Sequence, residues 1–166
     1  MLNKTATRRT VLGASALGIA GTALAFGGGG TKVDRRSFPV SKSDAAWKKQ
    51  LGPQRYRILR EEGTERAFSS PLNKEKRDGI YHCAGCDQAL FSSATKFDSG
   101  TGWPAFTKPI ASSRIGYARD MSFGMARTEE HCSRCGGHMG HVFNDGPAPL
   151  GKRHCVNGLS LKFRPA

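Results

Sequence analysis

Acidic residues are scarce in this sequence: 13 Asp and Glu stand against 26 Lys and Arg, giving a formal net charge of +13 over 166 residues. Only three of the basic residues, Lys4, Arg8 and Arg9, fall within residues 1–25, so most of the excess belongs to the rest of the chain. A strong positive charge favours contact with anionic surfaces or nucleic acids. Because no run of Lys or Arg is interleaved with aromatic residues, we interpret the charge as nonspecific and expect no nucleic-acid partner.

Long apolar runs are also missing, and the one candidate lies near the N-terminus. Val11–Phe26 is uncharged and rich in Ala, Gly and Leu, but its 16 residues fall short of the about 20 that cross a bilayer. A basic start and the small-x-small site Ala23-Leu24-Ala25 are typical of a signal peptide that is cut after Ala25. The pair Arg8-Arg9 before a mildly apolar core resembles a twin-arginine export signal.

These features predict an export signal over residues 1–25, a flexible linker over 26–42, and a folded domain over 43–166. The expected location is the periplasm, reached by the twin-arginine route, with membrane contact only through the signal. Two alternatives stay open, namely a signal for the general secretion route and an uncleaved membrane anchor.

The folded part predicts a mainly β domain that opens with two short helices. Trp47 and Leu51 lie on one helix face, Gly52 ends that helix, Pro53 suits the first turn of a second one, and Gly63 can end it. Short β-branched or aromatic segments between Gly, Pro, Asp and Ser then favour antiparallel strands with long loops. The expected strands are Ile80–His82, Ala89–Phe91, Arg114–Tyr117, Ser122–Arg127, His141–Phe143, His154–Val156 and Leu159–Phe163.

Only five cysteines occur, and this odd number leaves one over if all the others pair. Four of them form two CxxC units, each with a glycine inside it or directly after it, which allows the tight knuckle that presents two sulfurs to a tetrahedral metal. One CxxC alone also suits a redox motif, but two in one small domain favour a closed four-thiolate site. We therefore predict one structural Zn²⁺, bound by Cys83, Cys86, Cys132 and Cys135.

The remaining thiol is Cys155, within Arg153-His154-Cys155-Val156-Asn157. The thiolate is the nucleophile in thiol chemistry, and cationic neighbours favour it. In a strand Arg153, Cys155 and Asn157 share one face, while His154 points to the other. A lone cysteine in a strand is often only a small buried apolar residue, so its role as nucleophile depends on which side chains surround it.

Segments upstream of Cys155 supply candidates for the side chains that surround its thiol. His138, His141 and the following Asp145 suit acid–base chemistry near neutral pH, with a second metal site as the alternative. Trp103, between a glycine and a proline in a loop, either meets a ligand or packs in the core. The residues by themselves leave both questions open.

Several groups of residues between Trp47 and Phe163 occur in the order and spacing of a known family. They are Arg60-Glu61-Glu62-Gly63-Thr64-Glu65, the two CxxC units, Gly102-Trp103-Pro104, His138-Met139-Gly140-His141-Val142-Phe143, Asp145-Gly146-Pro147 and Arg153-His154-Cys155-Val156-Asn157. Together they resemble the B-type methionine-R-sulfoxide reductases. The resemblance implies two antiparallel sheets with a zinc on the far side from the active site. It also implies reduction of methionine R-sulfoxide, free or in proteins, and hence repair of oxidised proteins.

By this resemblance Cys155 is the nucleophile, which attacks the sulfoxide sulfur and becomes a sulfenic acid. Trp103 and Phe143 form the apolar wall for the S-methyl group. The sulfur becomes electrophilic when its oxygen is protonated or hydrogen-bonded, which a histidine–aspartate set can provide. The groups around the sulfoxide oxygen and the thiolate are then His138, His141, Asp145, Arg153 and Asn157.

The sequence departs from the commonest family pattern at Thr101, where many members carry a second cysteine that resolves the sulfenic acid. His154, Gly158 and Met139 also replace a more usual Tyr, Ser and Leu. Because the other cysteines are assigned to zinc, we predict that an external thiol donor, such as a thioredoxin-like protein, reduces the sulfenic acid. Two other classes are the alternatives: a nucleic-acid-binding zinc ribbon, and a thiol redox sensor or peroxidase centred on Cys155.

Overall fold

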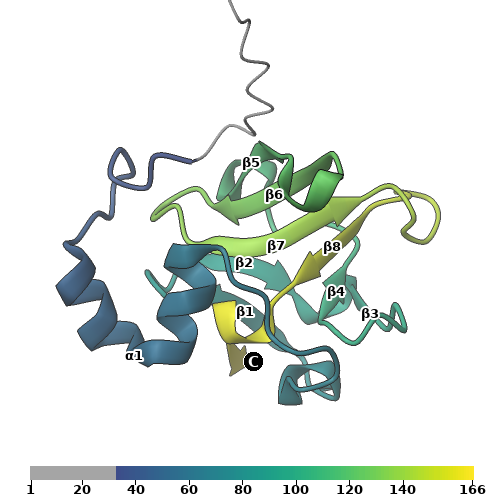
Figure 1. Ribbon diagram of the computed structural model, residues 1–166. Helices are drawn as coiled ribbons and strands as arrows, with labels where there is room; N and C mark the ends of the chain where they lie inside the picture. The colour runs from purple at the N-terminus through teal and green to yellow at the C-terminus, as the bar shows by residue number, and fades with distance from the viewer. Residues whose placement is uncertain (1–32) are drawn as a thin grey trace, which may run out of the picture.

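Figure 1 shows a computed structural model of the chain, in which residues 33–166 are described. The predicted export signal and the first part of the predicted linker lie outside the described residues. The described part begins with an irregular segment and helix α1, and the remainder is made of short strands joined by long loops (Figure 1). Within residues 33–166 no helix combines the length and the apolar character that a membrane crossing requires.

Helix α1, Asp44–Glu61, consists of two helical segments separated at Gly52, whose backbone is not helical (φ 68°). Pro53 begins the second segment, so the prediction of two short helices around Gly52 and Pro53 is confirmed. The second segment is capped by Glu62, which adopts the left-handed conformation that we expected of Gly63. The helix buries one apolar side against the rest of the domain, through Trp47, Leu51, Tyr56, Ile58 and Leu59.

The strands form two antiparallel sheets, as the resemblance implied. In the smaller sheet the order is β2 (Ala89–Ser92), β1 (Gly79–Cys83) and β9 (Leu161–Pro165). In the larger sheet it is β3 (Lys96–Phe97), β4 (Ala105–Phe106), β8 (Arg153–Val156), β7 (His138–Phe143), β6 (Arg127–Cys132) and β5 (Ile115–Asp120).

Aromatic side chains fill the space between the two sheets. Phe106 of β4 stacks on Phe91 of β2 with ring centroids 4.5 Å apart, and its edge meets Tyr81 of β1 at 4.9 Å. All three side chains are fully buried. Burial of these aromatic side chains contributes a large part of the hydrophobic stabilisation of a small β domain.

The predicted strand Ser122–Arg127 is wrong. Residues Ser122–Gly124 form a short 3₁₀ turn, because the Asp120 carboxylate accepts the backbone N–H of Ser122 at 2.8 Å and bends the chain. The strand begins only at Arg127 and continues through an acidic stretch to Cys132, where β5 and β7 pair with it on either side. Similarly, the last strand starts at Leu161 and not at Leu159, because Gly158–Ser160 is a 3₁₀ turn.

The described part of the predicted linker contacts the domain. The Val40 N–H donates to the carbonyl of Arg134 at 2.9 Å, and the ring of Phe38 packs edge-on against His131. Arg35 is only 7% exposed and reaches Glu62 and Glu129, both at 3.0 Å. Residues 35–40 therefore pack on the domain, while the division at residue 43 stays a prediction.

Candidate active site and metal centre

The register of the larger sheet places four of the predicted site residues on one face. His141 of β7 lies directly opposite Cys155 of β8, and Phe143 lies opposite Arg153. Directly opposed residues of antiparallel strands project to the same side. Close approach of the two strands depends on Gly140, because a Cβ there would collide with the carbonyl oxygen of Cys155.

A pocket of about 130 Å³ opens on this face. It brings together five of the residues predicted for the site, from a loop, from β7, from β8 and from the turn after β8. Three further residues complete its wall, and none of the three was expected from the sequence. The lining residues are Trp103, His141, Phe143, Cys155 and Asn157, together with Thr64, Arg127 and Gly140.

The other three predicted catalytic residues do not line the pocket: His138 and Arg153 are buried, and Asp145 is exposed at the surface. His138 is 2% exposed, and its ring lies 5.6 Å from that of His141. Arg153 is also buried, with its guanidinium 4.3 Å above the Phe143 ring, and it forms two hydrogen bonds of 2.8 Å to Asp145. His138 and Arg153 are thus placed to act through His141 and Phe143, and Asp145 holds Arg153 from the surface.

The thiol of Cys155 lines the pocket and is partly buried. Burial raises the pKa of Cys155 above its ordinary value, while the Thr101 hydroxyl, 3.9 Å from the sulfur, and the charge of Arg153 act in the opposite direction. Net desolvation therefore keeps much of the thiol protonated at neutral pH. A nearby proton acceptor is needed for efficient attack by this sulfur.

His141 is that neighbour, and the structure gives it a partner that sequence reasoning missed. Its Nε2 lies 2.7 Å from the carboxylate of Asp120, which also accepts from Arg127 at 2.7 Å. Burial lowers the pKa of His141, and the hydrogen bond to Asp120 raises it again in part. Desolvation alone would raise the pKa of Asp120, but hydrogen bonds from Ser122 and His141 outweigh it and hold that pKa below its usual range.

Ionised Asp120 therefore fixes the orientation of the His141 ring, with Nε2–H as donor, and leaves the other ring nitrogen as a base. Asp120 and Arg127 stand opposite each other at the ends of β5 and β6. No local sequence motif marks these two residues, and only the pairing of the two strands brings Arg127 to the pocket and Asp120 to His141.

A second chain of contacts holds His138. The carboxylate of Glu129 accepts from His138 Nδ1 at 2.7 Å and from Arg35 at 3.0 Å. Burial tends to raise the pKa of Glu129, but the hydrogen bond and charge of His138, with the charge of Arg35, bring it below its usual value. This buried network joins the segment before α1 to the histidine pair.

His154 points to the opposite face of the sheet, as its place in the strand predicts. There its Nδ1 lies 2.6 Å from the carboxylate of Glu130, and the ring packs against Phe91 in the core. Glu130 is fully buried, and desolvation raises its pKa. The sheet thus separates this core pair from the pocket.

Trp103 is held in the pocket wall by the loop that follows α1. Its indole N–H donates to the carbonyl of Glu65 at 3.1 Å. The Glu65 carboxylate in turn accepts the backbone N–H groups of Gly158 and Leu159, and the Glu65 N–H donates to Asn157 at 3.0 Å. Trp103 therefore faces the pocket and does not serve only as a core residue.

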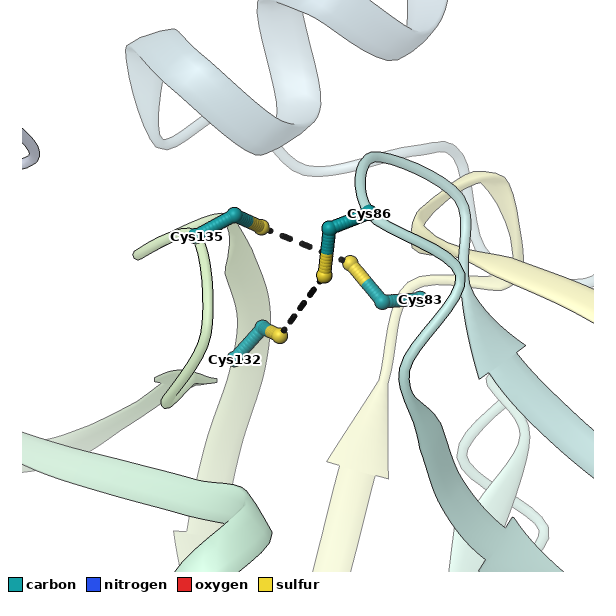
Figure 2. Close-up of side chains that lie close together, drawn as sticks. All are labelled: Cys83, Cys86, Cys132 and Cys135. Carbon is teal, nitrogen blue, oxygen red and sulfur yellow. Dashed lines mark hydrogen bonds between the residues drawn. The ribbon is translucent and has the colours of Figure 1, made fainter. Parts of the chain in front are cut away.

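The four remaining cysteines meet between the two sheets' ends (Figure 2). Their sulfurs all lie within 4.8 Å of one another, with Cys83 to Cys135 at 3.6 Å and Cys86 to Cys132 at 3.5 Å. Both short contacts join one CxxC unit to the other, as Figure 2 shows. This is the arrangement of a shared metal site and not of two separate redox pairs.

The geometry of this cluster suits a tetrahedral metal ion. Zn–S bonds of about 2.3 Å in a tetrahedron separate the sulfurs by about 3.8 Å, close to the observed contacts. Three of the cysteines are buried and the fourth is partly so, and the amide of Gln88 donates towards Cys132 at 3.6 Å. A closed set of four thiolates with such support fits a structural site and leaves no position for a substrate.

Fold and site together define a thiol-dependent oxidoreductase: a β domain with a cluster of four cysteines that can hold a metal ion and a separate aromatic pocket around one thiol. The profile of the SelR domain matches residues 51–165. The chain belongs to this family, that of the B-type methionine-R-sulfoxide reductases.

Three relatives illustrate the similarity, and each carries the name peptide methionine sulfoxide reductase MsrB. The protein from Leptospira interrogans is 54% identical over 77% of this chain and 98% of its own length. The protein from Agrobacterium fabrum is 52% identical over 80% of this chain and 98% of its own. The protein from Methanosarcina barkeri is 56% identical over 75% of this chain and 88% of its own.

Proposed function

We propose that the protein reduces methionine R-sulfoxide, free or in oxidised proteins, to methionine, with an external thiol as electron donor. The observation that carries this proposal is the pocket that sets Cys155 opposite His141 and beside Trp103 and Phe143. The name shared by its relatives gives independent support.

In the first step the sulfur of Cys155 attacks the sulfur of the sulfoxide. The thiol proton passes to His141 and from there to the sulfoxide oxygen, and ionised Asp120 stabilises the protonated ring. An S–S bond forms between Cys155 and the substrate as the S–O bond breaks and the protonated oxygen leaves as hydroxide. This hydroxide then attacks the sulfur of Cys155, so the S–S bond breaks, methionine leaves, and Cys155 becomes a sulfenic acid. An external dithiol then attacks this sulfur, becomes a disulfide, and releases the thiol of Cys155 with one water.

The shape of the pocket accounts for a preference between epimers. The apolar rings of Trp103 and Phe143 line the pocket together with Cys155, and the polar groups of His141 and Asn157 complete the lining. The sulfoxide sulfur is a chiral centre. Only one epimer can present its methyl group to the rings and its oxygen to the polar groups at the same time. Because the chain belongs to the B-type methionine-R-sulfoxide reductases, we assign the R epimer as substrate.

Turnover with dithiothreitol and each sulfoxide epimer tests the proposal. Methionine formation from the R epimer only, lost in Cys155→Ser, supports it. Equal turnover of the two epimers, or none by the folded wild-type protein, contradicts it. Peroxide reduction without sulfoxide reduction would point to the redox-sensor alternative.

We also propose that the four-cysteine site holds one structural Zn²⁺. The cysteines supply the whole coordination sphere, and zinc stabilises the ends of β1 and β6 by holding them together. No step of the reaction passes through it.

Export to the periplasm is a further proposal, supported by the sequence of residues 1–25 alone. Replacement of Arg8 and Arg9 by lysine in the full chain, followed by cell fractionation, tests the twin-arginine route. Unchanged export of the double variant would favour the general secretion route.

A further inference from the structure

Phe68 is the most exposed large apolar side chain among the described residues, at 73%. Its backbone is in the left-handed region, with φ 63°. A bulky residue other than glycine rarely adopts this conformation, and it persists only where the surrounding structure enforces it. Both the exposure and the backbone conformation work against stability, so this residue needs an explanation.

The loop that carries Phe68 is firmly held. The Phe68 N–H donates to the carbonyl of Gly102 at 2.7 Å. One side of the ring lies against Gly102, since a Cβ on that glycine would meet it. At the start of the same loop, Glu65 is tied to the turn after β8 through Gly158 and Leu159. The ring is therefore presented to solvent in a fixed position.

Phe68 lines a groove of about 170 Å³ next to the active-site pocket. Trp103 is common to both, because it lines the pocket around Cys155 and the groove beside Phe68. Apolar contributions to the groove come from Phe97 and Pro104 as well. Two lysines and one aspartate also line it, Lys74, Lys96 and Asp98, so its charge is positive.

We infer that this groove binds the stretch of polypeptide next to the oxidised methionine of a protein substrate, with a large apolar side chain against Phe68 and Trp103. The inference rests on the proposed function and names its substrate class. Free methionine sulfoxide fills only the pocket around Cys155. A neighbouring residue in a peptide is the group that can extend past Trp103 into the adjoining groove.

Two properties of the groove favour a peptide over other occupants. A fixed, exposed aromatic ring next to an indole offers contact area at little cost in conformational entropy. The positive charge favours peptides with an acidic residue near the apolar one. Oxidised methionines that local unfolding exposes bring apolar neighbours with them, which suits an enzyme of repair.

Kinetics with three substrates test the inference, with dithiothreitol as the only reductant. The substrates are free methionine R-sulfoxide and two blocked pentapeptides with methionine R-sulfoxide at the centre, flanked on both sides by glycine or by phenylalanine. We expect kcat/KM for the phenylalanine-flanked peptide to exceed that for the glycine-flanked peptide by about tenfold. In Phe68→Ala this ratio should fall to about twofold, and in Phe68→Tyr it should be retained.

Ile110→Ala is the matched control, because Ile110 is 45% exposed and lines neither the pocket nor the groove. It should leave the ratio as in the wild type. An unchanged ratio in a folded Phe68→Ala protein overturns the inference while the proposed function stands. Absence of turnover with all three substrates in the wild type overturns the proposed function instead.

A protein reductant is the competing occupant of the groove. If Phe68→Ala slows turnover with thioredoxin but leaves the peptide ratio with dithiothreitol unchanged, the groove binds the reductant and the inference is wrong. Far-ultraviolet circular dichroism and zinc content of each variant show that the fold is intact.

Discussion

The guanidinium of Arg35 donates to the carboxylate of Glu129 at 3.0 Å, across 94 residues of sequence. Both side chains are almost completely buried, at 8% and 7% exposure. The same carboxylate oxygen holds the ring of His138. A residue that precedes the predicted domain is thereby part of the network behind the active site.

Removal of Arg35 should destabilise the protein. Arg35→Ala leaves Glu129 buried with only His138 as partner, and loss of one member of a buried ion pair costs about 3 kcal/mol. Urea denaturation at pH 7 measures the free energy of unfolding. The neighbouring Arg36→Ala is the control, because its ion pair with Asp34 is exposed and should contribute nothing measurable. Equal stability of the two variants would show that residues 33–36 do not pack as described.

Loss of the Asp120 carboxylate should slow catalysis. Asp120→Asn removes the charge that orients His141 and stabilises its protonated form, and we expect kcat/KM for the R-sulfoxide to fall about 100-fold. Because the bond to Asp120 raises the pKa of His141, the acid limb of the pH profile should move to lower pH. Asp78→Asn, at an exposed carboxyl away from the pocket, should change neither quantity. A fall of less than threefold would exclude a role for Asp120.

The pH dependence of alkylation of Cys155 should show that burial raises the pKa of its thiol. Because burial raises the pKa of the thiol, the thiolate fraction at neutral pH is small and grows as the pH rises through that pKa. The rate of alkylation by iodoacetamide should therefore climb to a midpoint above that of an ordinary cysteine. Thr101→Val removes a hydrogen bond that favours the thiolate, so its midpoint should lie higher still. A midpoint below neutrality in the wild type would contradict this description of the pocket.

Metal removal should unfold the domain. Elemental analysis of purified protein should give about one zinc per chain. Cys83→Ser should lose the metal and the cooperative thermal transition, since four thiolates hold the ends of two sheets together. Cys155→Ser, which leaves the cluster intact, should keep both the zinc and the transition. A stable, metal-free Cys83→Ser protein would refute the structural role.

The position of Thr101 offers a way to change the catalytic cycle. With one equivalent of R-sulfoxide and no reductant, the wild type should release one methionine and form a sulfenic acid that dimedone traps on Cys155. In Thr101→Cys the new sulfur lies where the hydroxyl is 3.9 Å from Cys155, so an internal disulfide should form. Peptide mapping without reduction detects it. A disulfide to Cys155 in the wild type, with zinc retained, would disprove the one-cysteine cycle.

Local sequence was enough to predict the features that depend on short spacing. The CxxC units predicted that the four cysteines meet, because two residues between cysteines allow the tight knuckle in any surroundings. Alternation within residues 153–157 correctly placed Cys155 and His154 on opposite faces of one strand. Gly52 and Pro53 likewise marked the break in α1, through backbone preferences that belong to the residues themselves.

Features that depend on contacts between distant segments could not be predicted from local sequence. The run Arg127–Cys132 contains two glutamates and a histidine and lacks strand-forming composition, yet pairing on both sides makes it a strand. Only through that pairing does Arg127 reach the pocket and Asp120 reach His141. Arg35 could not be recognised either, since its partner Glu129 lies far along the chain.

Strand β6 joins the two centres of the molecule. Arg127, at one end of the strand, lines the catalytic pocket, and Cys132, at the other end, belongs to the four-cysteine cluster. The two ends of a six-residue strand are about 17 Å apart. Side chains alternate along such a strand, so a slip of a single residue would turn Thr128 and Glu130, in place of Arg127 and Glu129, to the face of the sheet that carries His141. The proposed zinc would fix the Cys132 end of this strand, so an oxidant that reacts with the four thiolates would loosen the strand that carries Arg127 without entering the pocket.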